Sequence, residues 1–312
     1  MGKLLLHIGS EKTGSKSLQA YLNLSSESGL PFDYLTGAGY MHGYCDYSIS
    51  AKLALKCYSS SELISDFDFE VLDERIQKIK DNPLPSVLSC ELFYRNPNAL
   101  RVFLSCCKKH SVDLCILSLV RSFSKYCRSL YGEAIKWGEV ERPLKWAKRS
   151  QESLLSMEAL SICADFCPGK TFLWNFDRLI DEVDWVDPIL FLLEKSFAQC
   201  FKFDRFSDDQ IAAFTHDLPH SQSLDPRLLS IMRESNRSFE DSRLTRALLS
   251  YLSKNHLVQK ALDNSYEHDE PSFSSVRMKR EFKQLEKFTE SVKHLHSHHL
   301  AFSGIKSLYI SF

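Results

Sequence analysis

Short apolar runs alternate with amphipathic stretches over the first two thirds of the chain. The runs cover residues 3–8, 86–90, 114–120 and 170–174, and each has the pattern of a buried strand. Between two of them, Leu72, Ile76 and Ile79 recur at the spacing of one helical face. Because strands that alternate with helices pair in parallel, the pattern predicts an α/β fold with a parallel sheet flanked by helices.

The pattern changes after residue 205, where apolar residues follow only helical spacing. Leucine and methionine recur in this way over 228–232 and 244–252. The stretch 263–275 is polar with one proline and is expected to be a loop before a basic helix. We therefore expect a helical C-terminal region without a further strand. Residues 1–260 should form the α/β domain, and 261–312 a helical extension packed on it.

The charge of the chain is nearly balanced. Its 312 residues include 39 Lys and Arg and 40 Asp and Glu, for a formal net charge of -1. No overall positive field therefore draws it to nucleic acid or to an acidic membrane, and any phosphate binding must be local. No apolar run approaches the roughly 20 residues of a membrane-spanning helix.

The cysteines and the first residues predict a cytoplasmic protein. The ten cysteines include no C-x-x-C pair, and about half lie in apolar stretches, so we expect reduced thiols. Residues 3–8 are too short for a secretory signal and lead directly into a loop. Leu6 stands where a myristoylation site requires Ser or Thr.

Polar residues follow three of the predicted strands. The loop 9–17 follows the first, Glu91 the second and Arg121 the third. In an open parallel sheet, ligands bind beyond the carboxyl ends of the strands, where helix N-termini converge. We therefore expect the three segments to meet at one edge.

The first loop has the chemistry of a phosphate-binding turn. Gly9 and Gly14 permit tight backbone turns, and Lys12, Lys16 and several hydroxyls add donors. The loop is not a Walker A motif, because Ser15 separates Gly14 from Lys16. A purely structural corner between strand and helix is the alternative.

Residues 6–19, LHIGSEKTGSKSLQ, resemble the 5'-phosphosulfate loop of sulfotransferases that use 3'-phosphoadenosine-5'-phosphosulfate (PAPS). The resemblance is to the bacterial and carbohydrate sulfotransferases, whose loop reads much like H-I-G-x-x-K-T-G-[ST]-[ST]-S-L-Q. The chain departs from it at Lys16, where the family usually has Ser or Thr. The resemblance implies a P-loop NTPase-like sheet and a cofactor-binding set of Gly9, Lys12, Thr13, Gly14, Ser15, Lys16 and Ser17.

A second segment, residues 119–131, looks like the 3'-phosphate segment of the same family. It has an arginine, Arg121, at the end of a strand and a serine, Ser129, eight residues later. The guanidinium offers a fork to a phosphate, and Ser129 offers a hydroxyl. Taken alone, Arg121 is better read as a surface or core-capping arginine. Weaker similarities at 87–92 and 236–238 extend the resemblance from residue 3 to about 250.

The resemblance implies transfer of a sulfuryl group from PAPS to a hydroxyl or amine, with a sugar or polysaccharide as the expected acceptor. Lys12 would stabilise the departing phosphate oxygen and Glu91 would take the acceptor's proton. His42 is the second candidate for the base or for acceptor binding. The alternatives are a Glu91 that only favours a helix N-terminus and a solvated His42.

Two further clusters of charged or metal-ligating residues lie near the C-terminal end of the sequence. Four histidines at 294, 296, 298 and 299 lack nearby carboxylates or cysteines at a site-forming spacing, so no metal site is predicted. Basic residues over 277–283 form one helical face. Such a face is ordinarily exposed to solvent, and the alternative is that it binds an anionic polysaccharide acceptor.

Two other functions compete with sulfuryl transfer. A P-loop nucleotide kinase or NTP hydrolase would require magnesium, and the broken Walker spacing and the lack of a clear acidic strand end count against it. A catalytically inactive nucleotide-binding protein of the same fold is the other. The substitution at Lys16 is the only hint of it.

Overall fold

The structure is a computed structural model, and two compact units make up the chain. It describes residues 2–9, 13, 15, 18, 19, 22, 32–35, 66–136, 138–151, 158–177, 233, 279–291 and 306–309. Unit 1 comprises Met1–Ser122, Met157–Ser221 and His298–Phe312, and unit 2 comprises Phe123–Ser156 and Gln222–Ser297. The division into a domain ending at residue 260 and a C-terminal extension stays a prediction.

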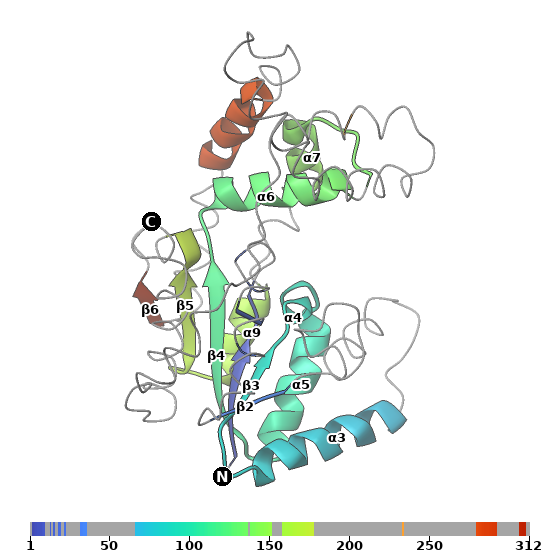
Figure 1. Ribbon diagram of the computed structural model, residues 1–312, viewed down its shortest axis with the longest axis vertical. Coiled ribbons are helices and arrows are strands. Elements are labelled where there is room, and N and C mark those ends of the chain that lie inside the picture. Colours follow the sequence, from blue (N-terminus) through green and yellow to red (C-terminus); the bar gives the residue numbers. More distant parts are fainter. Residues whose placement is uncertain are drawn as a thin grey trace, which may run out of the picture. The chain divides into compact units, whose positions relative to one another are not determined.

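Unit 1 is built on a six-stranded sheet with the order β2-β3-β1-β4-β5-β6, in which every pair is parallel (Figure 1). The strands are β1 (Lys3–His7), β2 (Asp33–Tyr34), β3 (Ser86–Ser89), β4 (Asp113–Val120), β5 (Thr171–Asn175) and β6 (Lys306–Tyr309). β1 lies between β3 and β4, with Leu6 opposite both Leu88 and Ile116. The predicted parallel α/β sheet is confirmed.

The central strands are apolar because both of their faces are covered. All residues of β3 and β5 are buried, and in β4 only the first, Asp113, is partly exposed. Strands buried on both faces carry continuous apolar runs rather than an alternating pattern. The four strands predicted from such runs are therefore all present.

Four described helices belong to unit 1: α3 (Asp66–Asp81), α4 (Leu92–Arg95), α5 (Pro97–Lys109) and α9 (Glu158–Phe166). Helices α3, α5 and α9 share one apolar cluster with Leu4, Leu6 and Ile116, so they cover the same face of the sheet (Figure 1). At the start of α5, the Asn96 side chain accepts a hydrogen bond from the Ala99 amide at 3.1 Å. This N-cap satisfies a helix-end donor that would otherwise lack a partner.

Two strands were not predicted, and the expectation that no strand follows residue 205 is wrong. β6 pairs in parallel with β5 at the sheet edge. Its sequence, KSLY, is half polar, so it lacks the apolar run by which the central strands were found. β2 has only two residues and no pattern of its own.

Unit 2 contains α6 (Phe123–Lys136), α7 (Pro143–Arg149) and a helix over 279–291. The ring of Tyr131 lies 5.5 Å from that of Trp146 and 6.1 Å from that of Phe282, between centroids. These aromatic contacts join the three helices in one apolar core. The helix over 279–291 confirms the predicted basic helix, and its Lys279, Arg280 and Lys283 are exposed.

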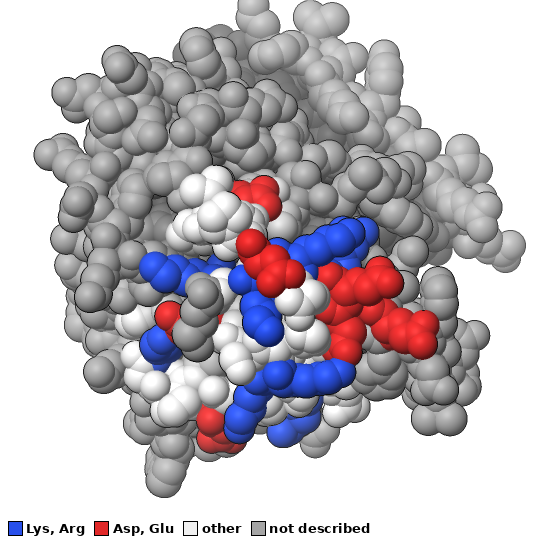
Figure 2. Space-filling model, turned by 90° about the horizontal axis from the view of Figure 1, so that it is seen from below, with Lys and Arg blue, Asp and Glu red and all other residues white. Residues whose placement is uncertain are grey.

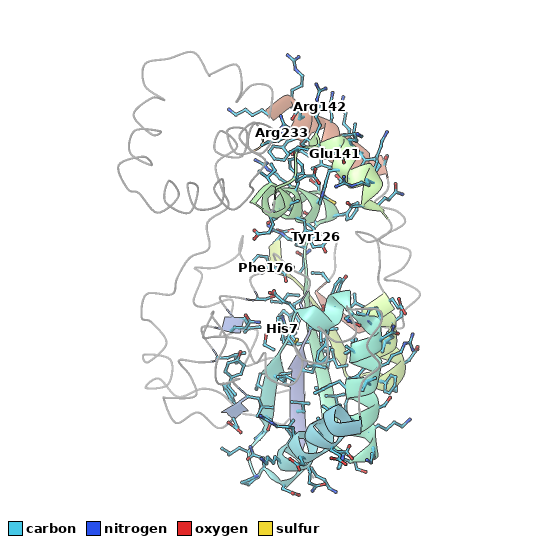
Figure 3. The ribbon with its side chains drawn as sticks, turned by 90° about the vertical axis from the view of Figure 1, so that its right-hand side faces the viewer. His7, Tyr126, Glu141, Arg142, Phe176 and Arg233 are labelled. Carbon is cyan, nitrogen blue, oxygen red and sulfur yellow. The ribbon has the colours of Figure 1, made fainter. Side chains whose placement is uncertain are left out.

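A buried ion pair lies in the same unit. Arg233 Nη1 is 2.5 Å from Glu281 Oε2 and donates to the Tyr131 hydroxyl at 3.3 Å. The Tyr131 hydroxyl in turn donates to the Glu141 carbonyl at 2.6 Å. Figure 3 labels Arg233, Glu141 and Arg142 in this region. The guanidinium therefore links three segments that are distant in sequence.

The surface carries both charges. At the end where α3 and the N-terminus lie, acidic and basic side chains intermingle on the described surface (Figure 2). Of the helices that the structure describes, none is long and apolar enough to cross a membrane. The seven described cysteines are buried free thiols.

Candidate functional site

The candidate site lies at the carboxyl edge of the sheet in unit 1. Strands β3, β1 and β4 are neighbours, so the residues that follow them share this edge. Gly9 comes two residues after β1, Glu91 two residues after β3, and Arg121 directly after β4. The order of the strands thus puts three predicted site segments next to one another.

Gly9 has no room for a side chain. A Cβ atom at this position would lie 2.6 Å from Nε2 of His7 and 2.9 Å from Oγ of Ser15. Thr13 and Ser15, both from the loop, are 0% and 3% exposed. The Gly9 backbone therefore lies close against His7 and Ser15, and the hydroxyl-bearing side chains of Thr13 and Ser15 are buried.

His7 connects this loop to the neighbouring strand. Its Nδ1 lies 2.8 Å from the hydroxyl of Ser89, which also accepts a hydrogen bond from Gln19 Nε2 at 3.1 Å. Because the Gln19 amide is the donor, the Ser89 hydroxyl proton is available for Nδ1. His7 is 1% exposed, and its burial lowers its pKa to about 3. The imidazole is therefore neutral at physiological pH.

Two buried polar atoms, one from β1 and one from the loop, face Gly9. Among the described residues, Nε2 of His7 and Oγ of Ser15 have no hydrogen-bond partner. Both lie within 3 Å of the place that a Gly9 side chain would occupy, at 2.6 and 2.9 Å. Figure 3 labels His7, the last residue of β1. Buried polar atoms without partners are uncommon in folded proteins, so such atoms often indicate a functional site.

Arg121 is held by the residues that follow β5. Its Nε and Nη2 donate to Oδ1 of Asp177 at 3.2 and 3.0 Å. The other carboxylate oxygen, Oδ2, accepts the Ser122 amide at 2.7 Å. The centre of the guanidinium lies 5.5 Å from the centroid of the Phe176 ring, which Figure 3 labels. The side chains of Arg121 and Asp177 are only 17% and 10% exposed.

This arrangement fixes the direction of the guanidinium. Asp177 is itself anchored, since its amide donates to Oδ1 of Asn175 at 3.0 Å. A planar guanidinium that is bound on one edge by a carboxylate and stacked on a ring loses little further freedom when it binds an anion. The carboxylate also offsets part of its charge, so a phosphate would bind the pair rather than an isolated cation.

Glu91 stands at the start of α4. Its carbonyl oxygen accepts the Tyr94 amide at 3.1 Å, and the residue is half-buried. A glutamate in this place is favoured by the positive end of a helix, which is the structural alternative weighed for it. Its place after β3 also leaves it beside the loop of β1, because the Cys90 amide donates to the His7 carbonyl at 2.9 Å.

The structure does not describe several of the predicted site residues. Lys12, Gly14, Lys16, Ser17 and His42 lie outside the described residues, as do the histidines over 294–299. Ser129 is half-buried on α6, which belongs to unit 2, whereas Arg121 belongs to unit 1. That Arg121 and Ser129 bind one phosphate stays a prediction.

Sequence reasoning missed His7, Phe176 and Asp177. Asn175 and Asp177 come at the end of a strand that the sequence did predict, so the rule applied to Glu91 and Arg121 would have found them. His7 was read as part of an apolar strand. A histidine inside such a run is a signal in itself, because a buried imidazole needs partners.

The fold defines the class of this protein: an α/β protein with a parallel sheet flanked by helices, in which Gly9 follows the central strand β1. Comparisons with protein-family models and with curated proteins find no match. Among solved structures, the chain is similar to the sulfotransferase domain from the curacin biosynthetic pathway, with 10% identity and a TM-score of 0.35. That similarity covers 90% of this chain and 97% of the other.

Proposed function

We propose that this protein is a sulfotransferase that moves the sulfuryl group of PAPS to a hydroxyl or amine of an acceptor. The main support is the close approach of Gly9 to His7 and Ser15, in a loop that follows the central strand and has a family-like sequence. A backbone that leaves no room for a Cβ, with hydroxyls buried beside it, suits a loop that wraps a phosphate group. The Arg121 and Asp177 pair on the next strand supplies a directed guanidinium.

The proposal assigns the donor to two groups of residues. The 5'-phosphosulfate is bound by the loop, through Lys12, Lys16, the backbone of Gly9 and Gly14, and the hydroxyls of Thr13, Ser15 and Ser17. The 3'-phosphate is bound by Arg121 and Ser129. Both assignments use charge-assisted hydrogen bonds, which are stronger than neutral ones.

The chemistry needs positioning and charge stabilisation more than covalent catalysis. An acceptor oxygen or nitrogen attacks sulfur while the bond from sulfur to the phosphate oxygen breaks, leaving 3'-phosphoadenosine 5'-phosphate. Lys12 stabilises the negative charge on the departing oxygen. Glu91 takes the acceptor's proton, and His42 is the alternative base.

The acceptor is proposed to be a sugar or polysaccharide. The exposed Lys279, Arg280 and Lys283 give the helix over 279–291 a basic face that suits an anionic polysaccharide. The buried free thiols support a cytoplasmic location as part of the same proposal.

Calorimetry with 3'-phosphoadenosine 5'-phosphate and with ATP, each with and without magnesium, tests the donor. We expect the bisphosphate to bind without metal and more tightly than ATP. Magnesium-dependent binding of ATP, with no affinity for the bisphosphate, would instead show a P-loop kinase or NTP hydrolase.

A Glu91→Gln variant tests whether the protein turns over. The variant should bind the bisphosphate normally and lose transfer from PAPS to an oligosaccharide panel, because the amide cannot take a proton. Unchanged transfer would remove Glu91 from this role. Tight binding of the bisphosphate by the wild-type chain, with no transfer to any acceptor, would favour the inactive nucleotide-binding alternative.

A further inference from the structure

Three side chains with metal-ligating atoms converge between α3 and α5. Oδ1 of Asp73 lies 2.8 Å from Sγ of Cys106 and 3.1 Å from Nε2 of His110. One ligand atom from each residue lies within 4.8 Å of the other two. The sulfur, nitrogen and oxygen atoms of such a set are the ligands that zinc takes in proteins.

The positions of these residues follow from the helices. Cys106 and His110 are four residues apart at the end of α5 and so lie on one helical face, and Asp73 comes from the facing side of α3. Cys106 is buried, whereas the His110 and Asp73 side chains are 15% and 33% exposed. The cluster is thus sheltered but open to an ion from solvent.

A fourth residue orients the histidine. Gln77 Nε2 donates to both carboxylate oxygens of Asp81, at 2.9 and 2.8 Å. The Gln77 amide oxygen is therefore the atom that faces His110 Nδ1, at 3.0 Å, and it accepts the Nδ1 proton. In the metal-free chain Nε2 donates to Asp73 Oδ1 at 3.1 Å, so a metal bound at Nε2 would replace that proton while Nδ1 keeps its hydrogen bond to Gln77. An outer hydrogen bond of this kind is the usual support of a metal-binding histidine.

We propose that Asp73, Cys106 and His110 bind a zinc ion, with Gln77 as the residue that orients His110. Zinc bonds of about 2.0–2.3 Å place tetrahedral ligand atoms roughly 3.3–3.7 Å apart, so Cys106 Sγ and His110 Nε2 would each move slightly away from Asp73 Oδ1 on binding. The S–H proton of Cys106 and the Nε2 proton of His110, both now donated to Asp73, leave to solvent as the zinc–sulfur and zinc–nitrogen bonds form. Water is the expected fourth ligand.

Lys109 limits which oxygen of Asp73 can bind a metal ion. Its ammonium pairs with Oδ2 of Asp73, so Asp73 can offer a metal only Oδ1 while that ion pair persists. One-oxygen coordination by a carboxylate is common for zinc. In the absence of metal, Cys106, Lys109 and His110 all interact with the same carboxylate, which keeps the cluster assembled before an ion arrives.

The site would act on the structure rather than on the proposed reaction. His110 comes three residues before β4 begins, so the cluster lies toward the amino end of the sheet, whereas Gly9 and Arg121 follow strand ends. An ion there would fasten α3 to α5, which cover one face of the sheet. The inference is therefore independent of the sulfotransferase proposal.

Metal titration of the full chain tests the site. The protein is first stripped with a chelator under reducing conditions, then titrated with Co²⁺ and with Zn²⁺ in competition. We expect one equivalent to bind, with a sulfur-to-cobalt charge-transfer band that zinc abolishes. Cys106→Ser should lose that band. Cys107→Ser is the matched control, since Cys107 is the next residue of α5 and lies outside the cluster.

Two further variants test the site with substitutions that should leave the fold intact. His110→Gln should weaken zinc binding at least tenfold, and Gln77→Leu about 10- to 100-fold, because the first loses a ligand and the second its orientation. Circular dichroism should show both folded. The absence of saturable binding, a band that survives in Cys106→Ser, or equal affinity in His110→Gln would each overturn the proposal.

Discussion

Oδ1 of Asp177 accepts two hydrogen bonds from one edge of the Arg121 guanidinium, and Oδ2 of the same carboxylate accepts the Ser122 amide. The carboxylate at the end of β5 thus fixes both the side chain and the backbone at the end of β4. An arginine held in this way needs little further ordering to bind an anion.

Arg121→Ala should weaken binding of 3'-phosphoadenosine 5'-phosphate by about 10- to 100-fold, the loss expected for hydrogen bonds to a charged group of about 1.5–3 kcal/mol. Adenosine 5'-phosphate lacks the 3'-phosphate and should bind equally well to both proteins. Arg121→Lys should restore little of the affinity, because an ammonium cannot bond Asp177 through two nitrogens. Calorimetry measures all of these. An equal loss for both nucleotides would place Arg121 elsewhere in the site.

Gly9→Ala should disturb the loop, because the new Cβ would lie 2.6 Å from the His7 ring. We expect a loss of about 1–3 kcal/mol in the free energy of unfolding, typical of overpacking, together with weaker nucleotide binding. Removing the ring in Gly9→Ala/His7→Ala relieves this clash, so the two substitutions should be less than additive in urea unfolding. Strict additivity would show that the contact is not the cause.

His7 predicts an acid-dependent loss of stability. Its pKa is about 3 in the folded chain and about 6.5 when unfolded, so the unfolded state binds more protons between these values. The contribution of His7 is therefore fully present above about pH 6.5 and is lost as the pH falls toward 3. At pH 4.5 the loss is of the order of 2–3 kcal/mol.

The variant His7→Asn isolates this effect, since an amide oxygen can still accept the Ser89 proton but cannot titrate. Urea unfolding at pH 7.5 and 4.5 should show a smaller decrease for the variant than for the wild type. Equal decreases in the two proteins would mean that His7 does not titrate as its burial requires.

Glu281→Gln should destabilise unit 2 strongly. Removing one partner of a buried ion pair leaves Arg233 charged and buried, at a cost of about 3–5 kcal/mol. Arg142 offers a matched control, because its Nε lies 3.7 Å from the other oxygen of Glu281 while its side chain is 63% exposed. Arg142→Ala should cost less than about 1 kcal/mol. Urea unfolding followed by tryptophan fluorescence measures both, and similar losses would contradict this assignment.

The sequence predicted those strands and helices whose own residues show an apolar run or helical spacing. Runs such as residues 114–120 are apolar because both faces of β4 are covered, and the spacing of Leu72, Ile76 and Ile79 matches the buried face of α3. β6 carried no such signal, because pairing with β5 rather than its own residues makes it a strand. Its place in the sheet depends on contacts across more than 130 residues of chain, from 172 to 306.

The candidate site was predictable only in part, for a similar reason. A residue after a strand end, such as Arg121, can be assigned to the ligand edge from the order of elements alone. The partner of Arg121 could not be assigned in this way, since Asp177 is 56 residues away and nothing local indicates the pairing. The proposed metal ligands are equally non-local, with Asp73 separated from Cys106 by 33 residues.

The origin of β6 has a consequence for biosynthesis. Residues 306–309 complete the sheet of unit 1, but they emerge from the ribosome only after 222–297, which belong to unit 2. Until then the outer edge of β5 has unpaired backbone groups, a ready template for another nascent chain. Unit 1, whose first strand is synthesised before unit 2, is therefore completed only after unit 2 has been synthesised.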